Sequence, residues 1–297
     1  MKITKLPESR TVWAEFDSVN DLMSADYSES ELTGSSYSLD YILDFDKKYK
    51  SRDAWAYGAY SREESYNMIT KGYLNEKASI AYEKAINRLG IKDADTYNIA
   101  PVARRRRRRN EYDGEICIDS YLAGSTDYYR KVSKVRTQDR IVRVIINLVY
   151  NGGTSAEMFM EYNIKAVSSV EKMLREGKIV EVYGAFTGLG TFKDRSFKNA
   201  LILTKIKEAD RGRDLRRMKS ACLTAFARKA IFRSPQLVAA KLGISVSEGL
   251  GEPINTTQNE DQLNRMIKEA AKQMQSEVVF FDGTSERGIN GVSSKNL

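Results

Sequence analysis

The stretch that decides the fold runs from Arg140 to Phe186 and reads RIVRVIINLVYNGGTSAEMFMEYNIKAVSSVEKMLREGKIVEVYGAF. Residues 141–149 are almost continuously apolar and β-branched, which is typical of a strand covered on both faces. The next segment, up to Gly177, has apolar residues at a spacing close to four, which predicts an amphipathic helix. Residues 179–183 then predict a second strand. A strand, a helix and a strand of these lengths predict a βαβ unit with parallel strands. The expected apolar stripe of the helix is Met158, Tyr162, Ala166, Val170 and Leu174.

The turn before this helix is a candidate anion-binding site. Asn151-Gly152-Gly153 is followed by Thr154 and Ser155, either of which suits the N-cap position. Backbone N–H groups at a helix N-terminus bind anions, so Gly153, Thr154 and Ser155 are the candidate residues. The order GxxxxGK[ST] of a phosphate-binding P-loop is missing, so nucleotide hydrolysis is not indicated. The default interpretation is an ordinary strand-to-helix turn with an N-cap, and the anion site is the alternative to it.

The composition argues against most catalytic chemistry. The chain of 297 residues contains no histidine, which removes the commonest general base and every Ser-His-Asp or Cys-His triad. Its two cysteines, Cys117 and Cys222, lie far apart and outside any CxxC array, so neither a disulfide framework nor a zinc site is indicated. We therefore predict a non-enzymatic protein with no catalytic residue, no metal and no cofactor.

The positive charge of the chain is concentrated in one block. There are 48 basic and 40 acidic residues, for a net charge of +8, and six of the basic residues form the run Arg104 to Arg109. The rest of the chain is nearly neutral. Any electrostatic function therefore depends on this run.

The order of elements predicts an α/β protein with a doubly wound, mostly parallel sheet and an N-terminal helical extension. We divide the chain into an N-terminal extension (1–60), a helical hairpin (61–99), a basic connecting segment (100–139), an α/β domain (140–283) and a flexible tail (284–297). The remaining predicted elements are a helix over Asn75–Leu89 capped by Gly90, a strand over 200–206, a long helix over 210–230, a short helix from Pro235 to Leu242, a helix over 261–275 and a strand over 277–281.

From residue 141 onward, this order of elements resembles a von Willebrand factor A-like domain. In such doubly wound sheets, ligands lie at the carboxyl ends of the strands. The family's metal motif, Asp-x-Ser-x-Ser after the first strand, reads Asn147, Val149 and Asn151 here. Only an Asp-Gly pair after the last strand, Asp282-Gly283, matches the family. The resemblance therefore implies the fold with a degenerate metal motif.

Four stretches also resemble an uncharacterised family of proteins encoded by phages and plasmids. The resemblance implies a mobile-element origin and no established activity. The stretches are YNMITKGY (Tyr66–Tyr73), the arginine run, EICIDSYLAGSTDYYRK (Glu115–Lys131) and NLVYNGGTSAEMF (Asn147–Phe159).

The arginine run suggests a nucleic-acid-binding protein. Six adjacent guanidinium groups repel one another unless they meet solvent or anions, and phosphates of DNA or RNA would neutralise them. A second basic stretch follows the run, and it would add to the same surface. The predicted contacts are Arg104, Arg105, Arg106, Arg107, Arg108, Arg109, Arg130, Lys131, Lys134 and Arg136.

Other interpretations remain open. The arginines could bind an acidic protein partner. They could also pair with nearby acids such as Glu111, Asp113 and Glu115, which would leave an adaptor or structural protein that uses its α/β domain for a protein partner or for self-association. A metal-dependent enzyme is the least favoured. No apolar run approaches the roughly 20 residues of a membrane-spanning helix, and the N-terminus lacks a signal peptide core. We therefore expect no membrane partner and a location in the cytoplasm, that of the host if the protein is phage-encoded.

Overall fold

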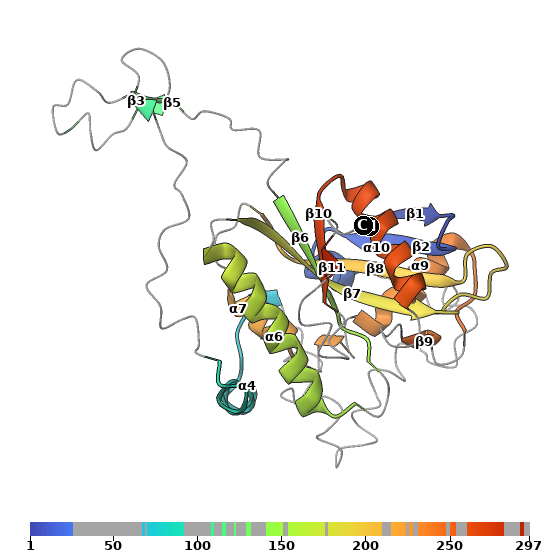
Figure 1. Cartoon of the computed structure of the whole chain (residues 1–297), viewed down its shortest axis with the longest axis horizontal. Helices are drawn as coiled ribbons and strands as arrows, with labels where there is room; N and C mark the ends of the chain where they lie inside the picture. Colours follow the sequence, from blue (N-terminus) through green and yellow to red (C-terminus); the bar gives the residue numbers. More distant parts are fainter. Residues whose placement is uncertain are drawn as a thin grey trace.

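The computed structural model describes residues 1–25, 67–68, 70–91, 108–109, 115–116, 122, 129–131, 141–150, 154–175, 178–209, 215–223, 226–227, 231–247, 250–253, 260–281 and 292–293. These residues form an α/β fold around a mixed sheet whose central pairs β10–β6 and β6–β7 are parallel, drawn in Figure 1 with helices on both sides. The α/β class predicted from the sequence is confirmed.

The main sheet has seven strands in the order β1-β2-β8-β7-β6-β10-β11, and a short strand β9 pairs with β7. The pairs β10–β6, β6–β7 and β2–β8 are parallel, whereas β1–β2, β7–β8, β7–β9 and β10–β11 are antiparallel. The strands are β1 (Lys2–Leu6), β2 (Thr11–Phe16), β6 (Ile141–Asn147), β7 (Ile179–Leu189), β8 (Asn199–Lys207), β9 (Glu252–Pro253), β10 (Glu277–Phe281) and β11 (Val292–Ser293).

The central βαβ unit forms as the sequence predicts. Helix α6 (Ala156–Arg175) connects β6 to β7, and the two strands pair in parallel with Ile141 opposite Ile179. The predicted stripe is partly wrong, because Met158 is 47% exposed while Phe159 is buried. The buried face of α6 is therefore rotated relative to the predicted stripe at its first turn.

Helices cover both faces of the sheet. On one face lie α1 (Val19–Ser24), α4 (Glu76–Leu89), α6, α7 (Leu215–Ala221), the 3₁₀ turn η3 (Ile231–Arg233) and α9 (Ser234–Leu242), which pack in the larger hydrophobic core. On the other face, α10 (Glu260–Met274) buries Leu263, Ile267 and Ala270 against strand residues such as Trp13 and Tyr183. Neighbouring residues of one strand, such as Val12 and Trp13 of β2, enter different cores, because successive side chains of a strand point to opposite faces of the sheet.

The first 16 residues differ from the sequence prediction. We expected an extension over residues 1–60, but β1 and β2 are strands of the main sheet, and β2 pairs in parallel with β8. Val12, Ala14 and Phe16 enter the larger core, while Trp13 enters the core beneath α10. This strand is short and lies far in sequence from its partner, so no local pattern reveals the pairing.

The connection from β7 to β8 also differs from a mostly parallel sheet. Residues 190–198 join the two strands, and the register is antiparallel, with Phe186 opposite Ile202. A connection of this length is too short for the crossover that parallel neighbours need.

The other predicted elements have mixed outcomes. Helix α4 is confirmed, with Asn75 as its N-cap and the left-handed Gly90 as its C-cap, and α9, α10 and β10 lie where the sequence predicts them. Of the long helix predicted over 210–230, the described residues show α7, a break at 222–223 and helical backbone at 226–227, and the other residues of this range lie outside the described ones. The predicted tail contains β11, which pairs with β10.

Candidate functional site

A second, three-stranded sheet brings the two basic stretches together. Strand β5 (Tyr129–Lys131) lies between β3 (Arg108–Arg109) and β4 (Glu115–Ile116), and all pairings are antiparallel. The register pairs Arg108 with Lys131 and Arg109 with Arg130. Two basic segments separated by about twenty residues of chain therefore lie on neighbouring strands. Glu115 pairs with Arg130 from the other side, so one acid also belongs to this arrangement.

The remaining predicted contacts of the basic surface lie outside the described residues. These are Arg104, Arg105, Arg106, Arg107, Lys134 and Arg136.

The predicted anion-binding turn is a capped helix start. The Oγ of Ser155 accepts a hydrogen bond from the backbone N–H of Met158 at 3.2 Å, which identifies Ser155 as the N-cap. Thr154 is half-buried beside it, and Gly153 lies outside the described residues. This geometry agrees with the ordinary reading of the turn, because the cap satisfies one of the N–H groups that an anion would otherwise bind.

A buried polar network lies at the carboxyl end of β6. The Asn147 Oδ1 accepts from the Val149 N–H at 3.1 Å and from the Thr187 hydroxyl at 2.9 Å, and its Nδ2 donates to the Val149 carbonyl at 3.1 Å. The Tyr150 hydroxyl lies 2.8 Å from the Asn147 carbonyl and 3.2 Å from Asn163 Oδ1. Thr187, Tyr150 and Asn163 come from three separate segments, which is why no sequence motif identifies the network.

This network has a structural role, and its Asn147 stands at the position where the von Willebrand A-like motif has its aspartate. Asn147 is completely buried, and both its amide oxygen and its amide nitrogen are engaged within the protein. Asn151 and Asp282-Gly283 lie outside the described residues. Within the described ranges, no group of three or more His, Cys, Asp or Glu residues could hold a metal ion.

A second polar cluster lies on the α10 side of the sheet. The Arg143 Nε donates to Glu181 at 2.7 Å. Arg143 also donates to the carbonyl of Met274, the last residue of α10, and to the Ser276 hydroxyl just after this helix. The Tyr183 hydroxyl lies 3.1 Å from Glu181 and 3.2 Å from Glu15. Burial, together with the negative charges of Glu15 and Glu181, raises the pKa of the Tyr183 hydroxyl far above its usual value. The hydroxyl is therefore a proton donor across the ordinary pH range and not a base.

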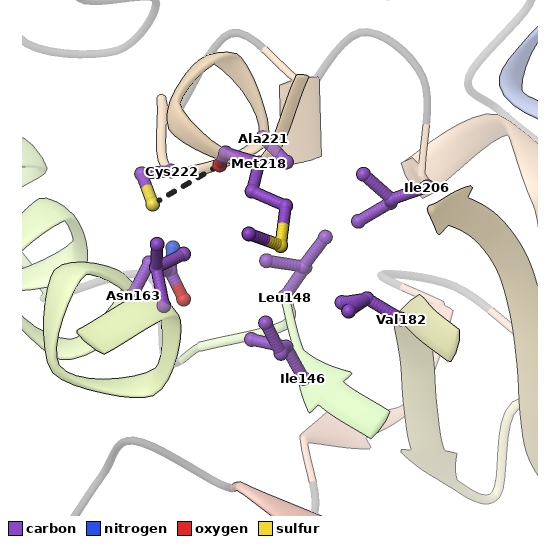
Figure 2. A pocket seen from close by; sticks show the side chains of 9 residues that line it. Ile146, Leu148, Asn163, Val182, Ile206, Met218, Ala221 and Cys222 are labelled. Carbon is purple, nitrogen blue, oxygen red and sulfur yellow. Dashed lines mark hydrogen bonds between the residues drawn. The ribbon is translucent and has the colours of Figure 1, made fainter. Parts of the chain in front are cut away.

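A small cavity lies between the sheet and helices α6 and α7 (Figure 2). It is lined by Ile146, Leu148, Asn163, Val167, Val182, Ile206, Met218, Ala221 and Cys222. The Asn163 Nδ2 has no hydrogen-bond partner among the described residues, and the Cys222 Sγ donates to the Met218 carbonyl at 3.4 Å. Burial raises the pKa of the Cys222 thiol well above its usual value, which keeps it protonated and unreactive. The cavity has room for about one water molecule, so it is a packing defect and not a substrate pocket.

No helix among the described residues has both the length and the apolar character needed to cross a membrane.

Comparison with known proteins gives a family without an assigned function. No curated protein and no solved structure matches the chain. The sequence model described as "Domain of unknown function (DUF7192)" matches residues 3–288, which is nearly the whole chain. The chain therefore belongs to the DUF7192 family.

Proposed function

We propose that this chain is a non-enzymatic, nucleic-acid-associated protein of a phage or plasmid, and that its arginine run contacts the phosphate backbone of DNA or RNA. The α/β domain, which we take to be von Willebrand A-like with a degenerate metal motif, would carry the basic segment on a stable body. The protein would act in the cytoplasm of the host cell.

The observation that carries this proposal is the register of β3 and β5. Arg108 and Arg109 pair directly with Lys131 and Arg130. Like charges at directly paired positions destabilise an antiparallel ladder. Phosphates that arrive from outside offset this repulsion, and each phosphate neutralised releases counterions that favour binding. The other predicted contacts, Arg104 to Arg107, Lys134 and Arg136, adjoin these two strands in sequence.

The proposal is tested by replacing Arg104 to Arg109 with Ser and measuring binding to labelled duplex DNA, single-stranded DNA and RNA by fluorescence anisotropy. If all six side chains contact phosphates, the slope of log K against log salt becomes shallower by up to about 5 on duplex DNA. A control with Lys at the same six positions keeps the charge and should retain binding. Unchanged binding by the Ser variant would overturn the proposal.

A second candidate function is an adaptor or structural protein. The register that places Glu115 opposite Arg130 favours it, because an acid of the same chain at this position would offset part of the positive charge of the small sheet. In that case the α/β domain would dock a protein partner or a second copy. Purified protein would contain no nucleic acid at low salt, and a defined protein would co-purify with it.

A further inference from the structure

A basic surface on the α/β body comes from two turns that are far apart in sequence. One is the β1–β2 hairpin, with Lys5 in β1 and Arg10 immediately before β2. The other is the connection between β7 and β8. It contributes Lys193, Arg195 and Lys198, and these five basic side chains are all exposed. We call this set the hairpin surface.

Direct contacts hold the two turns together. The N–H groups of Lys198 and Asn199 donate to the Arg10 carbonyl at 3.1 and 3.2 Å. The Arg10 side chain reaches back to the Ser196 carbonyl at 3.3 Å from Nε, and its Nη2 donates to the Arg195 carbonyl. The Lys5 ammonium lies 5.0 Å from the ring centroid of Phe197. The hairpin surface is therefore a fixed part of the fold.

Arg10 holds its side chain here at a conformational cost. Its φ of 53° lies in the left-handed region, which glycine and asparagine adopt with less strain than arginine does. Strain of this kind persists where the surrounding structure or a function requires the side chain. The two carbonyl contacts supply hydrogen bonds but no negative charge, so the guanidinium keeps its full positive field.

The basic side chains of the hairpin surface outnumber its acids, and none of them is paired with an acid among the described residues. Two acids lie in these turns. Glu8 pairs with Lys272 at 3.3 Å, and Asp194 accepts the N–H groups of Ser196 and Phe197 on its Oδ1 at 2.8 and 2.7 Å. These two hydrogen bonds, with the nearby charges of Lys5 and Arg10, hold the pKa of Asp194 below its usual value. Five positive charges therefore face solvent beside two carboxylates, of which Glu8 pairs with Lys272 and Asp194 is bonded within its own turn.

We infer that the hairpin surface binds the phosphate backbone of a nucleic acid, as a second contact separate from the arginine run. This inference rests on the proposed function, because it assumes that the nucleic acid bound by the arginine run also contacts the hairpin surface. Exposed, unpaired Lys and Arg side chains are the usual phosphate contacts of proteins. An acidic protein is the competing ligand, and the test below separates the two.

The central variant replaces Lys5, Lys193, Arg195 and Lys198 with Gln and leaves Arg10 in place, because Arg10 holds the two turns together. The control replaces Lys71, Lys84, Lys165 and Lys172 with Gln, which removes the same charge from α4, from the segment before it and from α6. Circular dichroism and thermal unfolding check that both variants fold. Affinity for a labelled DNA duplex is then measured between about 0.05 and 0.2 M salt, beside the Arg104–Arg109→Ser variant.

The hairpin variant should bind duplex DNA about tenfold or more weakly than the control, with a log–log salt slope shallower by about 2 to 4. Asp194→Asn keeps an acceptor oxygen for the turn and removes the counter-charge, so it should bind more tightly than the unmodified protein. Binding to polyglutamate, which stands in for an acidic protein, is measured in the same way. The inference is overturned if the hairpin variant binds DNA as the control does, or if it loses only its binding to polyglutamate.

The two proposals fail in different ways. If only the Arg104–Arg109→Ser variant loses binding, the proposed function stands and the hairpin surface has no part in it. Loss in the hairpin variant alone would support the hairpin surface and contradict the role of the run. An unmodified protein that binds no DNA or RNA would overturn both.

Discussion

Removing the Glu269 carboxylate should cost more stability than any change at the protein surface. Glu269 lies on α10 and is only 5% exposed. Its two oxygens accept the backbone N–H groups of Glu8 and Ser9 at 3.1 and 3.0 Å, together with the Ser9 hydroxyl. This carboxylate thus ties α10 to the β1–β2 turn, which lies about 260 residues earlier in the chain.

The magnitude follows from what Glu269→Ala leaves behind. A hydrogen bond to a charged group contributes about 1.5–3 kcal/mol, and a buried donor left without a partner costs about 1–3 kcal/mol. Glu8 is exposed, so its N–H group can turn to water, whereas Ser9 is 2% exposed and cannot. We therefore expect Glu269→Ala to lower the free energy of unfolding by about 3 kcal/mol.

Urea unfolding followed by far-ultraviolet circular dichroism measures this loss. Glu269→Gln keeps one acceptor oxygen and should lose about half as much. Glu8→Gln removes only the exposed 3.3 Å pair with Lys272 and should change stability by less than about 0.5 kcal/mol. A loss in Glu269→Ala no larger than that in Glu8→Gln would refute the reasoning.

Three further predictions concern the two cores. Gly184→Ala should destabilise the fold by about 1–3 kcal/mol in urea unfolding, because the added Cβ would lie 2.6 Å from Leu148 Cδ1 in the packed core, and a loss near zero would contradict this. Tyr183→Phe should reduce the loss of stability at alkaline pH. The raised pKa keeps the native hydroxyl protonated, so above about pH 10 only the unfolded chain loses this proton, and the free energy of unfolding falls by up to about 1.4 kcal/mol per pH unit. Equal alkaline losses in the variant and the unmodified protein would exclude that role. In a Cys117→Ser background, Cys222 should react with a thiol reagent only after urea unfolds the protein, since it is 1% exposed and its pKa is raised by burial, and labelling of the native protein would show that the cavity opens.

Local patterns predicted the parts of the fold that depend on neighbouring residues in sequence. The β-branched run before Asn147, the helix that ends near Arg175 and the strand after Ile179 each have a periodicity that identifies them, and together they imply a parallel pair. The caps at Asn75 and Ser155 are local too, because each side chain accepts an N–H group three residues later.

Long-range pairing accounts for what the sequence analysis missed. Strand β2 is six residues long and its partner β8 lies almost 190 residues later, so its place in the sheet depends on tertiary packing alone. The hairpin surface was missed for the same reason, because Lys5 and Arg10 meet Lys198 only in the folded chain. Conversely, Asn147 was noted as a degenerate metal position, and its role in a buried network depends on Thr187 of another strand.

The central claim is that this protein carries nucleic acid through its basic residues, and the ultraviolet absorbance ratio of the purified protein tests it most directly. Protein isolated at low salt should show the excess absorbance of bound nucleic acid, and washing the same preparation at high salt should return the ratio to that of protein alone, because salt competes with each phosphate contact. A ratio of pure protein already at low salt would contradict the claim.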